Sequence, residues 1–315
     1  MIKNLIFYFI LNLGCLPTAR AELLRFDHYH SQDEINNFLR LEAKQNPKFV
    51  WFQNLGHSVQ NREISYVIIS HGNPRKLPAI YLNGTHHGDE WSSTESILAL
   101  IDFLVGHHSE AIVAHILDSY ALFLQPLVNP DGHAASTRED SFGRDPNRDY
   151  AYPGSDPSKV FQVPEIRLVK NLVDQVHFHG AIAFHSGFEE ILWPWCYTNL
   201  STGDHNVLAQ TSQVVAQSMG FDRFLQSYFD YPTEGEFIDY LYAKDRTLAL
   251  TFEVSEIKTP PVSSLSGIVS NSIKGTLTYI FALEAKESGN LPRLGFMLPA
   301  AHFGKRTRAV GPYLE

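Results

Sequence analysis

Cysteine is nearly absent from this sequence, whose 315 residues include only Cys15 and Cys196. Cys15 falls in an N-terminal apolar segment with the character of a leader, so we expect no intramolecular disulfide in the mature protein. The sequence also lacks internal repeats, low-complexity linkers and, beyond that segment, any apolar run long enough to span a bilayer. Stability must therefore come from a packed core, for which a hydrophobic content of 44% in a chain of this length is sufficient.

The N-terminal segment has the pattern of a secretory signal peptide. Lys3 precedes the apolar stretch 5–16, and Ala19-Arg20-Ala21 has the small-x-small form of a cleavage site. We therefore predict a signal peptide at residues 1–21 and a secreted or periplasmic mature protein. A membrane anchor is the alternative, but the apolar stretch is too short to span a bilayer comfortably.

Strong positive charge is also missing, which argues against one class of partner. Residues 1–21 contain two of the 25 basic residues and none of the 34 acidic ones, so their removal changes the formal net charge from −9 to −11. An acidic surface of this kind does not favour nucleic acid. Lipid anchoring at Cys15 is not expected either, because Asn12 stands where an aliphatic residue is usual in lipoprotein leaders. We expect a monomer with no membrane span after signal removal.

Beyond the leader, short apolar runs alternate with amphipathic segments. Ser31, followed three residues later by Glu34, is typical of a capping box that opens a helix, and Pro47 ends that helix. Strands are expected at 64–70, 79–83, 121–128, 181–185 and 247–252, and further helices near 93–105, 164–177, 206–219 and 266–286. This alternation predicts an α/β fold in which one domain, 22–289, has a mixed, mostly parallel sheet with helices on both faces, followed by a tail at 290–315.

A polar segment directly after the expected strand 79–83 contains candidate metal ligands. His87 and Glu90 are three residues apart, so both side chains can project the same way and reach one ion, although such pairs also occur by chance. His185 ends another apolar strand, where, taken alone, it is more typical of a hydrogen-bonded core histidine. Together, two histidines and one glutamate with an open fourth position are the ligand set of a catalytic zinc ion.

Glu253 is the candidate general base. It follows the apolar run 248–252, so we expect its carboxylate at a strand end that faces a cleft, where polar groups from neighbouring strands gather. The alternative is an ordinary solvated or salt-bridged glutamate. Beside a metal-activated water, this carboxylate would accept the proton.

Six sets of residues, in order along the chain, resemble motifs of the zinc metallocarboxypeptidases of the carboxypeptidase A and B type. They are His87-Gly88-Asp89-Glu90-Trp91, Asn129-Pro130-Asp131-Gly132, Arg138 with Gly143-Arg144-Asp145-Pro146-Asn147-Arg148, His185-Ser186 with Leu192-Trp193-Pro194-Trp195, Tyr231 eight residues before Asp239, and Thr251-Phe252-Glu253. The resemblance covers nearly all of the mature chain. It implies that family's fold and metallopeptidase activity.

The resemblance also implies a metal site. By its match to the family motif, His87 rather than His86 would join Glu90 and His185 in binding one zinc ion per chain. Glu253 would activate the water that attacks the scissile carbonyl.

Further roles are implied for the substrate side of the site. Arg138 would stabilise the developing oxyanion, with Arg144 as its rival for this role. Asn147 and Arg148 would grip the terminal carboxylate of the substrate, a task suited to the planar guanidinium. Tyr231 would close over the bound residue. These roles describe an exopeptidase whose partner is a peptide with a free C-terminal carboxylate.

The preferred C-terminal residue and the natural substrate are left open. Ile238 occupies the position that sets the pocket floor in this family, and an apolar floor favours aliphatic or aromatic residues. Glu234 and Glu236 lie close in sequence, and either would favour a basic residue instead. Asp89, in place of the digestive enzymes' arginine, keeps open a second activity, that of a murein (cell-wall) peptide amidase or carboxypeptidase. A non-catalytic peptide-binding relative is a third alternative, although no ligand or base is missing.

Overall fold

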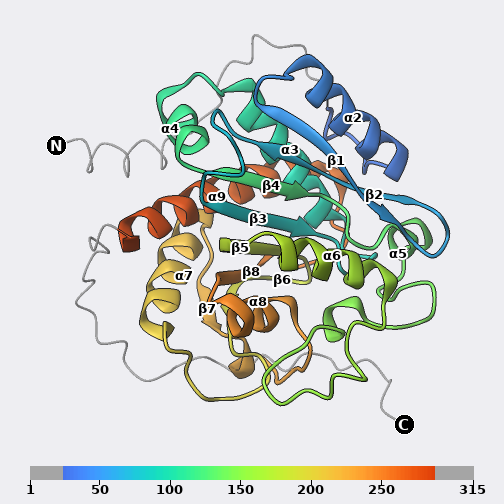
Figure 1. Ribbon diagram of the computed structural model, residues 1–315, viewed down its shortest axis with the longest axis vertical. Coiled ribbons are helices and arrows are strands. Elements are labelled where there is room, and N and C mark those ends of the chain that lie inside the picture. Colours follow the sequence, from blue (N-terminus) through green and yellow to red (C-terminus); the bar gives the residue numbers. More distant parts are fainter. Residues whose placement is uncertain (1–23, 288–315) are drawn as a thin grey trace.

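The computed structural model describes residues 24–287. The predicted signal peptide 1–21, with Cys15, and the predicted tail 290–315 lie outside the described residues. Within them, an eight-stranded sheet lies between two layers of helices, as Figure 1 shows. The prediction of one α/β domain with helices on both faces of a mixed sheet is confirmed.

The sheet has the strand order β1-β2-β4-β3-β5-β8-β6-β7. Its strands are β1 (Val50–His57), β2 (Glu63–Ile69), β3 (Ala79–Gly84), β4 (Ala121–Gln125), β5 (Phe178–His185), β6 (Phe188–Trp193), β7 (Arg223–Gln226) and β8 (Leu248–Ser255). The four central strands β4, β3, β5 and β8 are parallel to one another, whereas β2 and β6 pair with them antiparallel. The carboxyl ends of β3, β5 and β8 therefore meet at one edge of the sheet, where α/β proteins commonly bind ligands.

The helices pack in two layers that follow the alternation of side chains along the strands. They are α2 (Gln32–Gln45), α3 (Trp91–Gly106), α4 (Ala111–Ser119), α5 (Pro130–Ala135), α6 (Pro164–Gln175), α7 (His205–Met219), α8 (Phe237–Asp245) and α9 (Leu265–Glu287). In β3, Ile80 and Leu82 join the larger core with α2, α3, α4, α7 and α9, whereas Tyr81 joins the smaller core with α6 and α8. Side chains of a strand point to alternate faces, so the central strands are apolar on both.

The predicted elements correspond to β2, β3, β4, β5 and β8 and to α2, α3, α6, α7 and α9, with ends that differ by a few residues. The capping box before α2 is present, since the Ser31 hydroxyl accepts a hydrogen bond from the Glu34 backbone while the Glu34 carboxylate accepts one from Ser31 N at 2.8 Å. The C-cap of α2 is Asn46, directly before Pro47. Local capping chemistry was therefore sufficient to place this helix.

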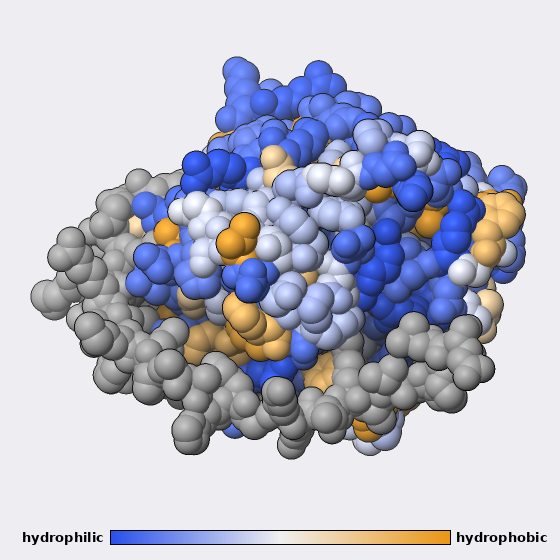
Figure 2. Space-filling model, turned by 90° about the horizontal axis from the view of Figure 1, so that it is seen from below, coloured by the Kyte–Doolittle hydropathy of each residue, from blue (hydrophilic) through white to orange (hydrophobic). Residues whose placement is uncertain are grey.

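Few large apolar side chains are exposed among the described residues. On the face shown in Figure 2, hydrophilic residues predominate and hydrophobic ones form small separate groups. Among residues 24–287, no single helix is long and apolar enough to cross a bilayer; α3 and α4 reach that length and composition only as a pair bent by 105°. Large apolar side chains are thus concentrated in the two cores.

Candidate active site

The predicted ligands and the predicted base lie at the carboxyl edge of the sheet. β3 leads directly into the loop that contains His87 and Glu90, β5 ends at His185, and Glu253 lies near the end of β8. In the parallel pairing of β5 with β8, His185 and Glu253 are directly opposite each other. The register of the sheet therefore determines the position of the candidate base relative to one candidate ligand.

His87, Glu90 and His185 form a candidate metal centre. Each of them offers one ligand atom, and these atoms lie within 4.8 Å of one another. Glu90 Oε1 lies 2.9 Å from His87 Nδ1, and Glu90 Oε2 lies 2.8 Å from His185 Nδ1. All three residues are buried, with 2–4% of their surface exposed. Among the described residues, this is the one group of three or more such side chains close enough to hold an ion.

The protonation of the group also fits a metal ion. His87 Nε2 lies 3.0 Å from Asp145 Oδ1, and because a carboxylate only accepts, Nε2 carries the proton. Nδ1 lies 2.9 Å from Glu90 Oε1 and 3.1 Å from Arg138 Nη1. Burial lowers the pKa of His87, but the negative charges of Glu90 and Asp145 raise it above its usual value. A proton or a cation is therefore favoured between Nδ1 and the Glu90 carboxylate. A divalent ion satisfies this arrangement, and Asp145 is the outer partner that orients a ligating histidine.

Electrostatics favour the ligand forms of the other two side chains. Burial lowers the pKa of His185, although Glu90 opposes the effect, so its imidazole is neutral at pH 7. Burial alone would raise the pKa of Glu90, but His87 and His185 hold it well below its usual range. A neutral imidazole and an ionised carboxylate are the states that bind a metal.

Local close packing holds the loop that contains the ligands. Gly88 has no side chain because a Cβ there would lie 2.0 Å from the backbone carbon of Gly132. Asn129, the first residue of the N-P-D-G segment, donates to His86 O at 3.2 Å and accepts from Gly132 N at 2.9 Å. Trp91 donates from Nε1 to Gly88 O at 2.8 Å. The N-P-D-G segment thus packs against the loop that contains the ligands. Gly88 of that loop permits the close approach to the backbone of Gly132.

Arg138 lies beside the candidate ligands, whereas its rival Arg144 does not. The Arg138 guanidinium donates to Asp145 Oδ2 at 2.9 Å, and its Nη1 lies 3.6 Å from Glu90 Oε1. Arg144 donates instead to Asp140 and to a backbone carbonyl at 2.8 Å, away from the cavity lining. Asp145 therefore joins His87 and Arg138, and its two oxygens position both.

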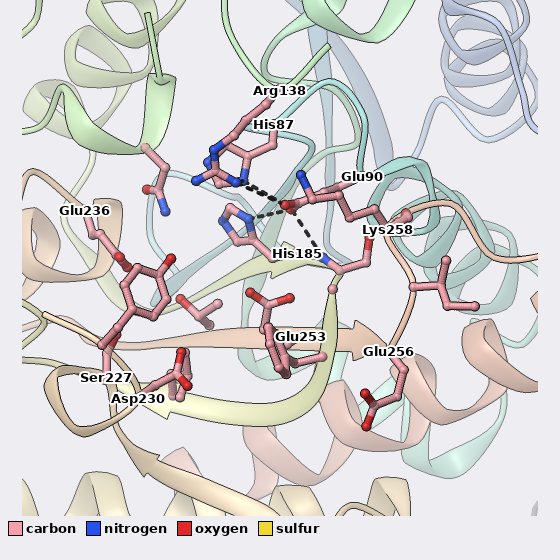
Figure 3. A pocket seen from close by; sticks show the side chains of 18 of the residues that line it. His87, Glu90, Arg138, His185, Ser227, Asp230, Glu236, Glu253, Glu256 and Lys258 are labelled. Carbon is pink, nitrogen blue, oxygen red and sulfur yellow. Dashed lines mark hydrogen bonds and ion pairs between the residues drawn. The ribbon is translucent and has the colours of Figure 1, made fainter. Parts of the chain in front are cut away.

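A cavity of about 580 Å³ opens beside the candidate ligands, and Figure 3 shows its charged side chains turned toward a common space. Its lining consists of His87, Glu90, Arg138, Asn147, Arg148, His185, Ser186, Gly187, Phe188, Leu192, Ser227, Asp230, Tyr231, Glu236, Thr251, Glu253, Glu256, Ile257 and Lys258. This volume is within the range of small-molecule and peptide-residue sites. The predicted ligands, base, arginines, asparagine and tyrosine all belong to one cavity.

Asn147, Arg148 and Tyr231 form one side of the cavity. Arg148 donates to the Tyr231 hydroxyl at 3.0 Å and to the Asn147 carbonyl at 2.8 Å. Asn147 Oδ1 accepts from Phe237 N at 3.0 Å, which leaves its side-chain amide nitrogen to other partners. A guanidinium and an amide that line a half-closed cavity are suited to a carboxylate.

The residue predicted for the pocket floor is buried in the smaller core. Ile238 is 1% exposed and packs there, and it is not among the residues that line the cavity. Glu236 lines it instead. Both residues lie at the start of α8, where the direction of each side chain depends on how the helix packs. Of the two glutamates that the sequence left open, Glu234 is exposed outside the lining.

Several residues in or beside the cavity were not singled out from the sequence, among them Asp145, Ser227 and Asp230. Asp145 belongs to one of the motifs, but the sequence analysis gave it no role. Its place in the chain between Arg138 and His185 could have suggested one. Asp230 and Ser227 line the cavity from the segment before Tyr231. Their place follows from the β7 edge strand, which the sequence did not predict.

Known proteins resemble this chain in sequence and in fold. A model of the zinc carboxypeptidase family matches residues 35–300. Zinc carboxypeptidase A 1 of Anopheles gambiae is 26% identical over 265 residues, which cover 73% of this chain and 60% of that protein. Carboxypeptidase A2 of Mus musculus is 24% identical over an aligned length of 316, covering 89% of this chain and 67% of that protein.

Two solved structures show the same fold. Carboxypeptidase A from Helicoverpa armigera superposes with a TM-score of 0.78 at 18% identity, covering 91% of this chain and 80% of that chain. A metallo-carboxypeptidase from Burkholderia cenocepacia superposes with a TM-score of 0.62 at 15% identity, covering 80% and 70%. Identities this low show likeness of fold alone.

The family match and the candidate site lie in the same part of the chain. The match runs from α2 to beyond the end of α9 and includes every residue of the cavity lining. The chain spans 60% of the first curated relative and 67% of the second. It belongs to the zinc carboxypeptidase family, whose metal suits the ligands His87, Glu90 and His185.

Proposed function

We propose that this protein is a zinc-dependent exopeptidase that hydrolyses the C-terminal peptide bond of peptides, with Glu253 as general base. The observation that carries the proposal is the pairing of His185 with Glu253 across β5 and β8, in the same cavity as Arg148. A candidate metal ligand, the candidate base and the candidate carboxylate-binding cation thus line one cavity.

A zinc ion in such a site acts as a Lewis acid and lowers the pKa of water. Glu253 accepts the proton of the water that attacks the scissile carbonyl, and then passes it to the departing amine. Arg138 faces the developing oxyanion, and Asp145 keeps its guanidinium oriented. A fixed cation is more effective here than in solvent because the Arg138 side chain is only 28% exposed and faces the buried carboxylate of Glu90.

Arg148 and Asn147 bind the α-carboxylate of the substrate, and this contact confines cleavage to the last peptide bond. Tyr231 already lies against Arg148 and contacts the bound residue from the open side. Peptides with an amidated C-terminus would lack the charge that Arg148 recognises. The leader pattern at residues 1–21 supports a secreted or periplasmic place of action.

The test is release of C-terminal amino acids from a mixed peptide library by the mature protein. We expect Glu253→Gln to release C-terminal amino acids at least about a hundredfold more slowly, because a general base contributes about 10²–10⁴-fold to the rate. The variant should still retain one zinc ion per chain. Glu189→Gln, which changes an exposed glutamate of β6, is the matched control and should keep full activity.

Three results separate the alternatives. Equal release by Glu253→Gln and the unchanged protein would remove Glu253 as base. Release that persists after chelation would contradict metal dependence. A zinc-loaded protein that releases nothing from ordinary peptides would refute the general exopeptidase and direct the assay to murein peptides that contain D-amino acids.

A further inference from the structure

Glu236 presents a carboxylate to the cation that must bind the substrate. Its side chain lies in the cavity lining with Oε1 at 3.3 Å from Arg148 Nη1. The hydroxyl of Thr233 donates to the same oxygen, and the Cys196 thiol donates to Oε2 at 3.4 Å. Figure 3 shows Glu236 at the end of the cavity away from Glu256 and Lys258. These contacts keep the Glu236 carboxylate in one orientation.

Asp230 is a second carboxylate at this end of the cavity. Its Oδ1 accepts from Arg223 Nη2 at 2.7 Å, and Arg223 also pairs with Glu190. Asp230 Oδ2 is buried and accepts no hydrogen bond from any residue in 24–287. Buried acceptors are usually hydrogen-bonded, so this oxygen favours a ligand that brings a donor. Asp230 lines the cavity, where a ligand would bind.

The charges around this end do not cancel. Glu190, Asp230 and Glu236 contribute three negative charges, whereas Arg148 and Arg223 contribute two positive ones, which leaves a net charge of about −1 when all are ionised. A substrate α-carboxylate at Arg148 adds another negative charge within a partly enclosed space. Like charges repel strongly where water is scarce, so a neutral C-terminal residue would bind against this repulsion.

A positively charged side chain on the last residue of the substrate neutralises this excess negative charge. Its α-carboxylate pairs with Arg148 while its own cation pairs with Glu236, so the two carboxylates no longer compete for one guanidinium. Asp230 Oδ2 offers the second acceptor. Leu192 and Thr251, which also line the cavity, are suited to the apolar stem of a long side chain.

We propose that the cavity selects a C-terminal lysine or arginine, and that Glu236 is the specificity-determining residue that contacts the substrate cation. This inference rests on the proposed exopeptidase function and adds its substrate class. It replaces the apolar floor that the sequence position of Ile238 suggested.

The experiment compares peptides that are identical except for a last residue of lysine, arginine, leucine or phenylalanine. In the unchanged protein we expect kcat/KM for lysine and arginine to exceed that for leucine by about tenfold or more. Glu236→Gln, which keeps the size of the side chain, should lower the lysine-to-leucine ratio by about ten- to a hundredfold, since hydrogen bonds to charged groups are of that strength. Partial unfolding cancels in this ratio because it lowers both rates equally.

Glu234→Gln is the matched control, because it removes the same charge two residues away, outside the cavity lining. It should leave the lysine-to-leucine ratio unchanged. Faster release of leucine or phenylalanine by the unchanged protein would overturn the inference and leave the exopeptidase standing, as would an unaltered ratio in Glu236→Gln. Failure to release any of the four residues would refute both proposals together.

Discussion

Asp239 should make the free energy of unfolding depend on pH. This aspartate of α8 is fully buried, and its carboxylate accepts backbone hydrogen bonds from Cys196 N at 2.9 Å and from Tyr197 N at 3.3 Å. Burial, together with the negative charge of Glu236, nevertheless raises its pKa from 3.8 to about 7. At pH values between these two, the folded protein therefore holds a proton on Asp239 that the unfolded chain has already released.

The sign and the size follow from this difference. Because the pKa of Asp239 is raised in the folded protein, its contribution to the free energy of unfolding is fully present at low pH. That contribution is lost as the pH rises through the pKa of the folded state. Between about pH 5 and about pH 7 the loss is about 1.4 kcal/mol for each pH unit, or about 3 kcal/mol in total. Asn at this position carries no charge at any pH and still offers one carbonyl acceptor, so Asp239→Asn should lack this loss.

Urea unfolding of the unchanged protein and of Asp239→Asn, measured at several values from about pH 5 to about pH 8, tests the reasoning. We expect the difference in free energy of unfolding to move by about 3 kcal/mol in favour of Asp239→Asn as the pH rises. Glu234→Gln, which alters an exposed carboxylate nearby, should show no such trend. A difference between the two proteins that is constant with pH would mean that Asp239 stays ionised throughout, and would refute the argument.

Two further substitutions probe the loop and the sheet. Gly88→Ala would place a Cβ 2.0 Å from the backbone of Gly132, so we expect the loop with the metal ligands to shift and the zinc content after dialysis to fall well below one ion per chain; full zinc retention would contradict this. Tyr279→Phe should lower the free energy of unfolding by about 2 kcal/mol in urea titrations, because the Tyr279 hydroxyl donates to Leu248 O and accepts from Ala181 N at 2.8 Å, and both groups would be buried without a partner. A change under about 0.5 kcal/mol would show that the backbone finds other partners.

Local patterns were sufficient for the elements that frame the site, and insufficient for those that shape its pocket. The apolar runs of β3, β5 and β8 are buried on both faces and end in polar residues, so the sequence located the edge where ligands gather. By contrast, β1 and β7 are short or half-exposed edge strands, and α5 has six residues. Their formation depends on neighbours that are distant in sequence, which no local period records.

The same distinction applies to single side chains. Glu236 and Ile238 are two residues apart at the start of α8, and only the packing of that helix against the smaller core decides which of them faces the cavity. Motif position suggested Ile238, because a motif records the order of residues and not their direction. Asp145 was overlooked for a related reason, since its role is to join His87 with Arg138, two residues that a sequence does not show to be neighbours.

The site therefore combines two kinds of support with different sensitivity to change. His185 and Glu253 lie on paired strands, so their separation is set by the backbone hydrogen bonds between β5 and β8. His87 and Glu90 lie on a loop whose position depends on a few side-chain bridges, among them those of Asn129 and Asp145. Loss of one bridge should weaken metal binding while the sheet remains intact, because the strands contribute one ligand and the base, whereas the loop contributes two ligands. Zinc content, rather than global stability, is thus the more sensitive measure of damage to this site.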